Sequence, residues 1–261
     1  MGAKTVRNTA GLVSSAFSRA IRWGILTHNP VTNSEPPIPR KRPKVSLTVA
    51  KQDTLIGSTR GPSCMATFIE VTAALGARRG EVLALRWSDI VGGRAIIARS
   101  LSQTRAGLEF KGTKTERPRT VSMTAEALAA LEAHRKRQDE FRQQYGTDYR
   151  ADLDLFFANP DGSPLRPDSV SASISLLWRR LKLPPGASLH KLRHTHATHM
   201  LVGGVPSQVV SERLGHSSVR GTAEVYAHSL RGQDDEAVRK LEEFQRASRS
   251  AAGAPAVGQV Q

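Results

Sequence analysis

The sequence predicts a mainly α-helical protein with one small three-stranded antiparallel β-sheet, and therefore the α+β class. Apolar residues recur at steps of three or four along much of the chain, which is the period of a helix with one buried face. Three short β-prone segments, 94–99, 108–111 and 120–123, lie close together and are separated by turn residues. Of the 261 residues, 39% are hydrophobic and 23% are charged, which is typical of globular domains.

The most unusual property of the composition is its charge. The chain has 38 lysines and arginines against 23 acidic residues, a net charge of +15 and a pI of about 10.8. Such an excess favours a polyanion as partner, because phosphates release counterions when basic groups bind them. A solvated basic surface and an acidic membrane are the alternatives, and nucleic acid is the interpretation that we favour.

Cysteine content and hydropathy indicate the compartment. Cys64 is the only cysteine, so neither an internal disulfide nor a cysteine metal cluster is expected. No apolar run is long enough to span a bilayer, and no signal-peptide pattern opens the sequence. We therefore expect a cytoplasmic protein with no membrane partner.

The first 45 residues predict a helix and a linker. Apolar residues at helical spacing predict a helix over 5–26, which cannot bury its apolar face alone and is expected to end a larger bundle. Residues 30–45 are rich in proline and predict an extended linker. Its basic cluster consists of Arg40, Lys41, Arg42 and Lys44. This cluster either is solvated or crosses a phosphate backbone, and the overall charge favours the second.

Two helices are predicted before the β-prone segments. Thr48 is a suitable N-cap for the first, and the second, over 63–76, ends at a glycine. Just after that glycine, Arg78 precedes Glu81 by three residues. Taken alone, Arg78 and Arg79 would be ordinary surface arginines at the start of a helix.

The three β-prone segments predict an antiparallel meander in chain order. Lys114 lies on the turn between the second and third segments, and Lys111 ends the second. A lysine at the tip of a hairpin is usually solvated, so position alone gives neither of them a function.

Two further helices are predicted after the sheet. Thr124 is expected to cap a helix over 125–138, and a polar loop over 139–151 is expected to follow it. Asp168 is expected to cap the next helix, which continues through Leu181.

The next two predicted helices carry residues that suit phosphate chemistry. His190 and Arg193 are three residues apart on a helix over 189–202, so they share one face. A helix over 207–214 ends at Gly215, which is a typical C-terminal glycine.

Past that glycine the sequence places His216 and, ten residues later, Tyr226. Arginine, histidine and tyrosine are what phosphodiester chemistry without a metal would use. A guanidinium grips a phosphate with two hydrogen bonds. A tyrosine hydroxyl can become a covalent nucleophile when the phosphate beside it is activated.

These segments resemble the C-terminal signature of the tyrosine recombinases, also called phage-type integrases. The matching phrases are His-x-x-Arg-His-Thr from residue 190, Leu-Gly-His-Ser-Ser from residue 214 and Thr-x-x-x-Tyr-x-His from residue 222. Gly-x-Arg-x-x-Glu from residue 76 resembles the first arginine box of the family and selects Arg78 over Arg79.

The resemblance implies three parts. Residues 1–45 resemble the end of the helical core-binding domain and its basic linker, and we expect this segment to be truncated because the preceding helices are missing. Residues 46–230 would be the tyrosine-recombinase catalytic domain. Residues 231–261 would be a C-terminal helix and a disordered tail. In the family such a helix often docks on a neighbouring subunit, so we expect a homotetramer in the synaptic complex; a helix packed on its own domain is the alternative.

The implied function is site-specific recombination of double-stranded DNA through a 3′-phosphotyrosine, in the bacterial cytoplasm at the nucleoid. The implied catalytic residues are Tyr226, Arg78, Lys114, His190, Arg193 and His216. The tyrosine attacks, the arginines stabilise the phosphate charge, and the histidines assist proton transfer and bind the phosphate. Lys114, with Lys111 as the alternative, protonates the leaving 5′-oxygen. Because the arginines supply the positive charge, neither a metal nor another cofactor is implied.

Competing interpretations remain for the histidines and for the function. His190 and His194 have the helical spacing of zinc ligands, but Lys191 stands where a metallohydrolase has its glutamate base. The other function classes are a type IB topoisomerase and a non-catalytic DNA-binding remnant of an integrase. A supercoil-relaxation assay separates the first from a recombinase, and a covalent-complex assay separates the second.

Overall fold

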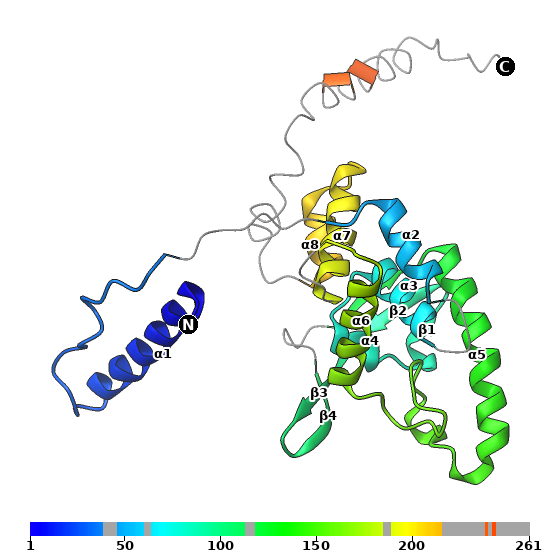
Figure 1. Ribbon diagram of the computed structural model, residues 1–261, viewed down its shortest axis with the longest axis horizontal. Coiled ribbons are helices and arrows are strands. Elements are labelled where there is room, and N and C mark those ends of the chain that lie inside the picture. The colour runs from blue at the N-terminus through cyan, green and yellow to red at the C-terminus, as the bar shows by residue number, and fades with distance from the viewer. Residues whose placement is uncertain are drawn as a thin grey trace, which may run out of the picture. The chain divides into compact units, whose positions relative to one another are not determined.

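The computed structural model describes residues 1–38, 46–59, 64–112, 118–184, 189–215, 238–239 and 242–243 (Figure 1). The chain divides into two compact units, Met1–Lys44 and Val45–Gln261. Of the predicted C-terminal helix, the residues that are described are helical. Within the described ranges, no helix has both the length and the apolar character needed to cross a membrane.

The described part of the N-terminal unit contains one helix, α1 (Ala3–Arg22). It ends earlier than predicted, because Gly24 adopts a left-handed φ of 74° and lets the Ile25 N–H reach the Ala20 carbonyl at 3.0 Å. Asn29 then fixes the chain after the turn, since its side-chain amide donates to the Ser14 carbonyl at 3.0 Å. No residue of α1 is buried.

The core of the second unit surrounds α3 (Met65–Leu75), which is buried along most of its length. The helices that contact α3 include α2 (Val49–Gly57), α5 (Ala125–Tyr145) and α7 (Leu189–Val202). Large side chains that are fully buried in this core include Phe68, Leu75, Phe157 and Trp178. The core thus joins segments that are more than a hundred residues apart and fixes where the ends of these helices lie.

In the described part of the chain, the β-strands form two sheets. The three-stranded antiparallel sheet that the sequence predicts is confirmed, but its strands are β1 (Ile90–Val91), β2 (Arg94–Ile97) and β5 (Arg119–Ser122), in that order. The other two strands, β3 (Arg99–Thr104) and β4 (Gly107–Gly112), pair with each other as a separate hairpin (Figure 1).

The predicted meander is wrong because the β-run that starts at Arg94 changes partner at Ala98. Ala95 and Ile97, before the break, are fully buried and belong to the strand that pairs with β5. Residues 99–104, after the break, pair with β4 instead. The sequence is β-prone on both sides of the break, so local pattern does not show the change of partner.

Helix α5 continues through the predicted loop over 139–151 as far as Tyr145. The reason is tertiary, because Gln138 is buried on the inner face of the helix. Its side chain accepts a hydrogen bond from the Trp87 indole at 2.7 Å and donates one to the Leu155 carbonyl at 2.9 Å. These bonds hold the polar second half of α5 against the core.

Two of the three predicted helix caps are confirmed. The hydroxyls of Thr48 and Thr124 accept N–H bonds in the first turns of α2 and α5, at 3.4 Å and 3.3 Å. Asp168 is not the cap of α6 (Pro167–Arg180), because the helix already starts at the proline and Arg166 holds the N-cap position. Proline suits the first helical position, where its missing N–H has no partner to lose.

Helices α7 and α8 (Ser207–Leu214) have the predicted bounds. They pack through a second apolar cluster that consists of Ala197, Leu201, Val210 and Leu214. The C-terminal ends of α3 and α8 meet, because Leu214 lies beside Gly76 and Arg193 donates to the carbonyls of both residues. The start of β5 reaches the same place, since Arg119 donates to the Arg213 carbonyl. The short helix α4 (Arg79–Leu83) begins at the same place, and the candidate site is located there.

Candidate active site

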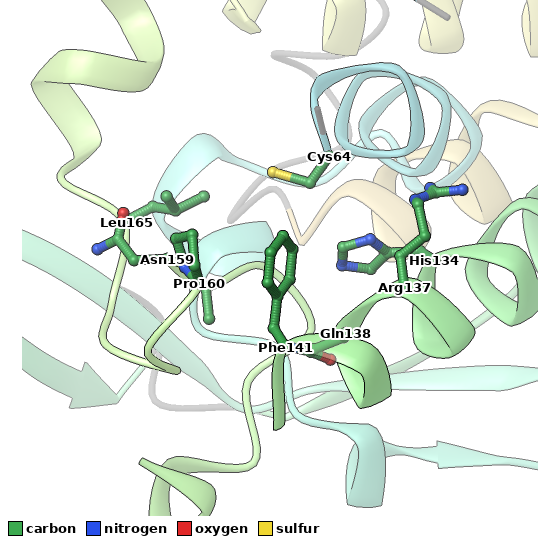
Figure 2. A pocket seen from close by; sticks show the side chains of 9 residues that line it. Cys64, His134, Arg137, Gln138, Phe141, Asn159, Pro160 and Leu165 are labelled. Atoms are coloured by element: carbon green, nitrogen blue, oxygen red, sulfur yellow. The ribbon is translucent and has the colours of Figure 1, made fainter. Parts of the chain in front are cut away.

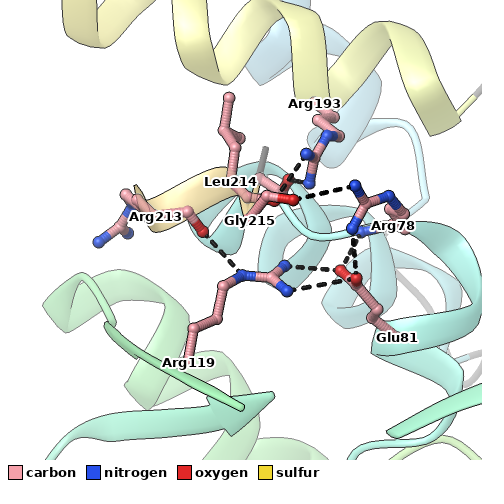
Figure 3. Close-up of polar contacts among 8 residues, drawn as sticks. Arg78, Glu81, Arg119, Arg193, Arg213, Leu214 and Gly215 are labelled. Carbon is pink, nitrogen blue, oxygen red and sulfur yellow. Dashed lines mark hydrogen bonds and ion pairs between the residues drawn. The ribbon is translucent and has the colours of Figure 1, made fainter. Parts of the chain in front are cut away.

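Three consecutive carbonyl groups at the C-terminal end of α8 each accept a hydrogen bond from a different arginine (Figure 3). Arg119 Nε donates to the Arg213 carbonyl at 2.9 Å, Arg193 Nη2 to the Leu214 carbonyl at 2.6 Å, and Arg78 Nη2 to the Gly215 carbonyl at 3.1 Å. The last carbonyls of a helix lack partners within the helix and carry its negative dipole end. They therefore gather guanidinium groups from β5, α7 and the start of α4.

Two glycines allow side chains to pack directly against the ends of α8 and α3. Gly215 ends α8 at a left-handed φ of 65°, and a Cβ on it would lie 3.0 Å from Arg119 Nη1. Gly76 ends α3 at a left-handed φ of 59°, and a Cβ on it would lie 2.5 Å from the ring of His196. Both positions therefore require glycine for conformation and for space.

Glu81 is the carboxylate of the site, and it pairs with two of the arginines (Figure 3). Arg78 Nη1 donates to it at 2.7 Å, and Arg119 donates through Nη1 at 3.2 Å and Nη2 at 2.6 Å. Only 2% of its side chain is exposed. Burial raises the pKa of Glu81, but the hydrogen bonds and charge of Arg119, with the bonds from Arg78, outweigh burial and lower the pKa overall.

The two predicted arginines differ in their access to solvent. Arg193 is 2% exposed and lies between two helix ends, since its Nη1 donates to the Gly76 carbonyl at 2.8 Å while its Nη2 reaches the end of α8. The side chain of Arg78 is 34% exposed. Arg193 therefore forms the floor of the site, and Arg78 is open to an incoming anion.

Arg213 and His196 lie behind these groups. Arg213 Nη2 donates to the Ala74 and Ser122 carbonyls, both at 2.8 Å, and its Nε donates to His196 Nε2 at 3.0 Å. Burial, with the positive charge of Arg213, lowers the pKa of His196 to about 4. At neutral pH this imidazole is therefore uncharged and accepts the hydrogen bond.

His190 lies at the start of α7, on the exposed side of the helix. Its ring meets that of His194 edge to face, with centroids 4.6 Å apart. Lys191, next to it, turns inward to the Pro184 carbonyl at 3.4 Å and to the Trp178 ring. Desolvation lowers the pKa of Lys191. His190 and Arg193 were predicted to share one face of the helix; in the structure His190 is exposed and Arg193 is buried.

The structure brings Arg78 and Arg193 together and does not describe several other predicted residues. Tyr226, His216, Lys114 and the basic cluster Arg40, Lys41, Arg42 and Lys44 lie outside the described residues. Lys111, the alternative to Lys114, is on β4 and pairs with Glu109 at 2.9 Å.

Sequence reasoning missed Arg119 and Arg213. Neither stands in a phrase that marks it, and each is one of many arginines in a basic chain. Their importance comes from contacts with residues far away in sequence, which no local spacing reports.

The histidines of α7 bond to different neighbours. His196 is turned toward α8, and His199 Nε2 lies 2.9 Å from the Leu47 carbonyl. Among the described residues, no three histidine, cysteine or acidic side chains are grouped so that they could hold a metal ion. The site instead combines several guanidinium groups with one carboxylate, which suits an oxyanion such as a phosphate.

A separate cavity of about 210 Å³ lies against α5 and the loop over 158–165 (Figure 2). Its lining includes Cys64, His134 and Phe141. His134 Nε2 is bonded to the Phe156 carbonyl at 2.6 Å, and burial raises the pKa of the Cys64 thiol. None of the predicted site residues lines this cavity.

Comparison with known proteins gives one consistent match. The sequence model of the phage integrase family matches residues 54–232. The ICEBs1 integrase of Bacillus subtilis is 30% identical over 253 residues, and a tyrosine recombinase XerC-like protein of Caldanaerobacter subterraneus subsp. tengcongensis is 26% identical over 262 residues. Each alignment covers 92% of this chain and 66% of the relative, so the chain spans slightly less than two thirds of the length of either protein.

Solved structures share the fold. The Tn1549 transposon integrase in complex with transposon right end DNA superposes with a TM-score of 0.77 and 21% identity, over 94% of this chain and 80% of that one. A lambda integrase dimer bound to a COC′ core site gives a TM-score of 0.61 and 19% identity, over 86% and 73%. The predicted fold class, mainly helical with small antiparallel sheets, is confirmed.

Proposed function

The chain belongs to the phage integrase family, and from this premise we propose that it is a site-specific tyrosine recombinase that cleaves and rejoins DNA. One observation of the structure supports this function more than any other. Arg78 and Arg193, which are 115 positions apart in the sequence, donate to the consecutive carbonyls of Gly215 and Leu214. These carbonyls belong to the last two residues before His216 in the sequence.

In the proposed reaction, Tyr226 Oη attacks the scissile phosphorus and the bond from phosphorus to the 5′-oxygen breaks. His190 assists removal of the tyrosine proton, and Lys114 gives a proton to the leaving 5′-oxygen. The product is a 3′-phosphotyrosine and a free 5′-hydroxyl. Attack by the 5′-hydroxyl of another strand reverses these steps and rejoins the DNA without ATP.

The arginines would supply the electrostatic part of catalysis. Negative charge grows on the non-bridging oxygens in the pentavalent transition state, and fixed donors at that place are usually the largest catalytic term. Arg193 is held on two sides by carbonyls, so it needs little reorganisation. Arg78 is the exposed one, and a phosphate oxygen would replace the Gly215 carbonyl as its acceptor. His216 would donate a further hydrogen bond.

The proposed partner is double-stranded DNA that contains a recombination site. The net charge of +15 supports this proposal, and so do structural relatives that were solved as complexes with DNA. We further propose that the C-terminal helix joins subunits into a tetramer at synapsis, and that the protein works at the bacterial nucleoid.

The function can be tested by trapping the covalent intermediate. On a nicked suicide substrate, the parent chain should form a protein–DNA adduct that survives SDS, and Tyr226→Phe should form none while binding DNA equally well. Tyr145→Phe, at a partly exposed tyrosine of α5, is the control for loss of a hydroxyl.

The adduct should also form in excess EDTA, because guanidinium groups replace a metal in this mechanism. An adduct with Tyr226→Phe would contradict the assignment of the nucleophile. Relaxation of supercoiled DNA without strand exchange would instead favour a topoisomerase.

A further inference from the structure

We propose that Arg119 is a positioning residue for this active site, which sets the place of Arg78 and of the C-terminal end of α8. The inference rests on the proposed function and extends it to a residue that lies outside the recombinase signature. It is carried by three contacts of the Arg119 guanidinium, two to Glu81 and one to the end of α8 (Figure 3).

The first part of the argument is the carboxylate that two arginines share. Glu81 is almost fully buried, and it accepts hydrogen bonds from Arg119 and from Arg78 at the same time. Arg119 makes the bidentate pair, at 2.6 Å and 3.2 Å, which fixes the plane of the carboxylate. Arg119 therefore fixes the orientation of the Glu81 carboxylate, and the carboxylate in turn orients the Arg78 guanidinium.

The second part is the end of α8. The third nitrogen of the same guanidinium, Nε, donates to the Arg213 carbonyl, and Gly215 packs directly on the group. Arg119 therefore ties the last turn of α8 to the carboxylate that orients Arg78. One planar group bonds to both, so its rigid fork couples the position of the α8 end to that of the carboxylate.

The third part is access. The Arg119 side chain is 10% exposed, compared with 34% for Arg78. Its nitrogens are directed to Glu81 and to the Arg213 carbonyl, so it faces the protein. Arg119 would therefore act through Arg78 and the α8 end, without touching DNA.

The test compares adduct formation by Arg119→Ala, Arg119→Lys and the parent. A lysine keeps the charge beside Glu81 but cannot serve both carboxylate oxygens and the Arg213 carbonyl. We expect single-turnover cleavage to slow by about 10- to 100-fold in both variants, because small errors in position are costly in catalysis. The Kd for DNA should change by less than about twofold, since DNA is bound mainly through other phosphate contacts.

Arg99→Ala is the matched control. Arg99 also pairs with a largely buried carboxylate, that of Asp89, at 2.6 Å and 2.7 Å. It lies on β3, which contacts α4. It has no described contact with Arg78 or Arg119. Its cleavage rate should remain within about twofold of the parent if stability alone is affected, and urea unfolding should verify that every variant is folded.

A double-mutant cycle distinguishes positioning from a separate contribution. If Arg119 acts in part through Arg78, then Arg78→Lys combined with Arg119→Lys should lose less cleavage rate than the product of the two single losses. Two results would overturn the inference. One is a double variant whose loss of cleavage rate equals the product of the two single losses, and the other is a folded Arg119→Ala variant that cleaves as fast as the parent.

A second readout does not depend on cleavage. In ¹⁵N NMR of the arginine side chains, the Nε–Hε group of Arg78 should lose order in Arg119→Lys and keep it in Arg99→Ala. Unchanged order would overturn the inference even if the parent chain formed no adduct. Absence of an adduct with the parent, by contrast, would contradict the proposed function alone.

Discussion

His196 is a neutral base beside two arginines. Its Nε2 accepts a hydrogen bond from Arg213, and its ring covers Gly76. Burial and the Arg213 charge lower its pKa to about 4, and the charges of Arg193 and His199 act in the same direction. A hydrogen bond with the Ala73 backbone acts against this shift, since it raises the pKa. A proton on this ring would face Arg213 at 3.0 Å and would remove the acceptor.

Acid should therefore destabilise the fold through His196. Between pH 6.5 and about 4 the unfolded chain binds a proton on this histidine and the folded chain does not, so the free energy of unfolding should fall as the pH falls. The full loss over that window is ~3 kcal/mol. Urea unfolding as a function of pH should show a shallower loss for His196→Gln, whose side-chain oxygen can still accept from Arg213.

His28→Gln, at an exposed position of the N-terminal unit, controls for removal of a histidine. A pH profile of His196→Gln that is parallel to that of the parent would show that another group causes the acid sensitivity.

At the same scale, the sequence predicted those site residues whose signal is local. Arg193 shares a helix with His190, and Gly215 stops a helix that the preceding apolar pattern defines. Arg119 could not be predicted in this way, because its partners Glu81 and Arg213 are 38 and 94 residues away. Such pairs become neighbours only when α8 packs against β5 and Glu81 of α4 reaches Arg119.

Helix α5 shows how a buried polar group extends an element. Its second half is strongly polar, so the sequence predicted a loop there. Gln138 is 8% exposed and joins Trp87 to Leu155, and thereby holds the helix on the core beyond the predicted end. The helix bounds that were predicted well, those of α7 and α8, each lie directly before a glycine, Gly203 and Gly215.

Gln138→Leu should destabilise the catalytic unit by ~2–4 kcal/mol, because it leaves the Trp87 indole N–H and the Leu155 carbonyl buried without these partners. The volume is nearly conserved, so loss of packing contributes little. Urea unfolding followed by tryptophan fluorescence would measure the effect. Gln144→Leu, at an exposed position of the same helix, should change stability by less than ~0.5 kcal/mol. Equal effects at the two positions would show that the bridge is not what stabilises α5.

At the scale of the whole molecule, charge is the dominant property. The net charge of +15 is spread over both units, and exposed basic residues also lie away from the candidate site, at Arg135 and Lys136 on α5 and at Arg179 and Arg180 on α6. Phosphate contacts set register and affinity without reading sequence. Net charge alone therefore supports DNA binding but does not identify which surface binds.

Salt dependence can make that distinction. If basic side chains bind phosphates, the logarithm of the association constant should fall linearly with the logarithm of salt concentration, by about 0.9 per phosphate contact on duplex DNA. Replacing the linker cluster Arg40, Lys41, Arg42 and Lys44 with glutamine should make this slope shallower by about 0.9 for each phosphate that the variant no longer neutralises.

The matched control replaces Arg135, Lys136, Arg142 and Arg150, which are exposed on α5 and just after it, and lowers the net charge equally. Fluorescence anisotropy between roughly 50 and 200 mM salt would measure both slopes. The linker variant should flatten the slope more than the control, because direct binding of phosphates, and not net charge, releases counterions. Equal flattening would show that the linker does not cross the phosphate backbone, and a parental affinity that is insensitive to salt would contradict phosphate-dominated binding altogether.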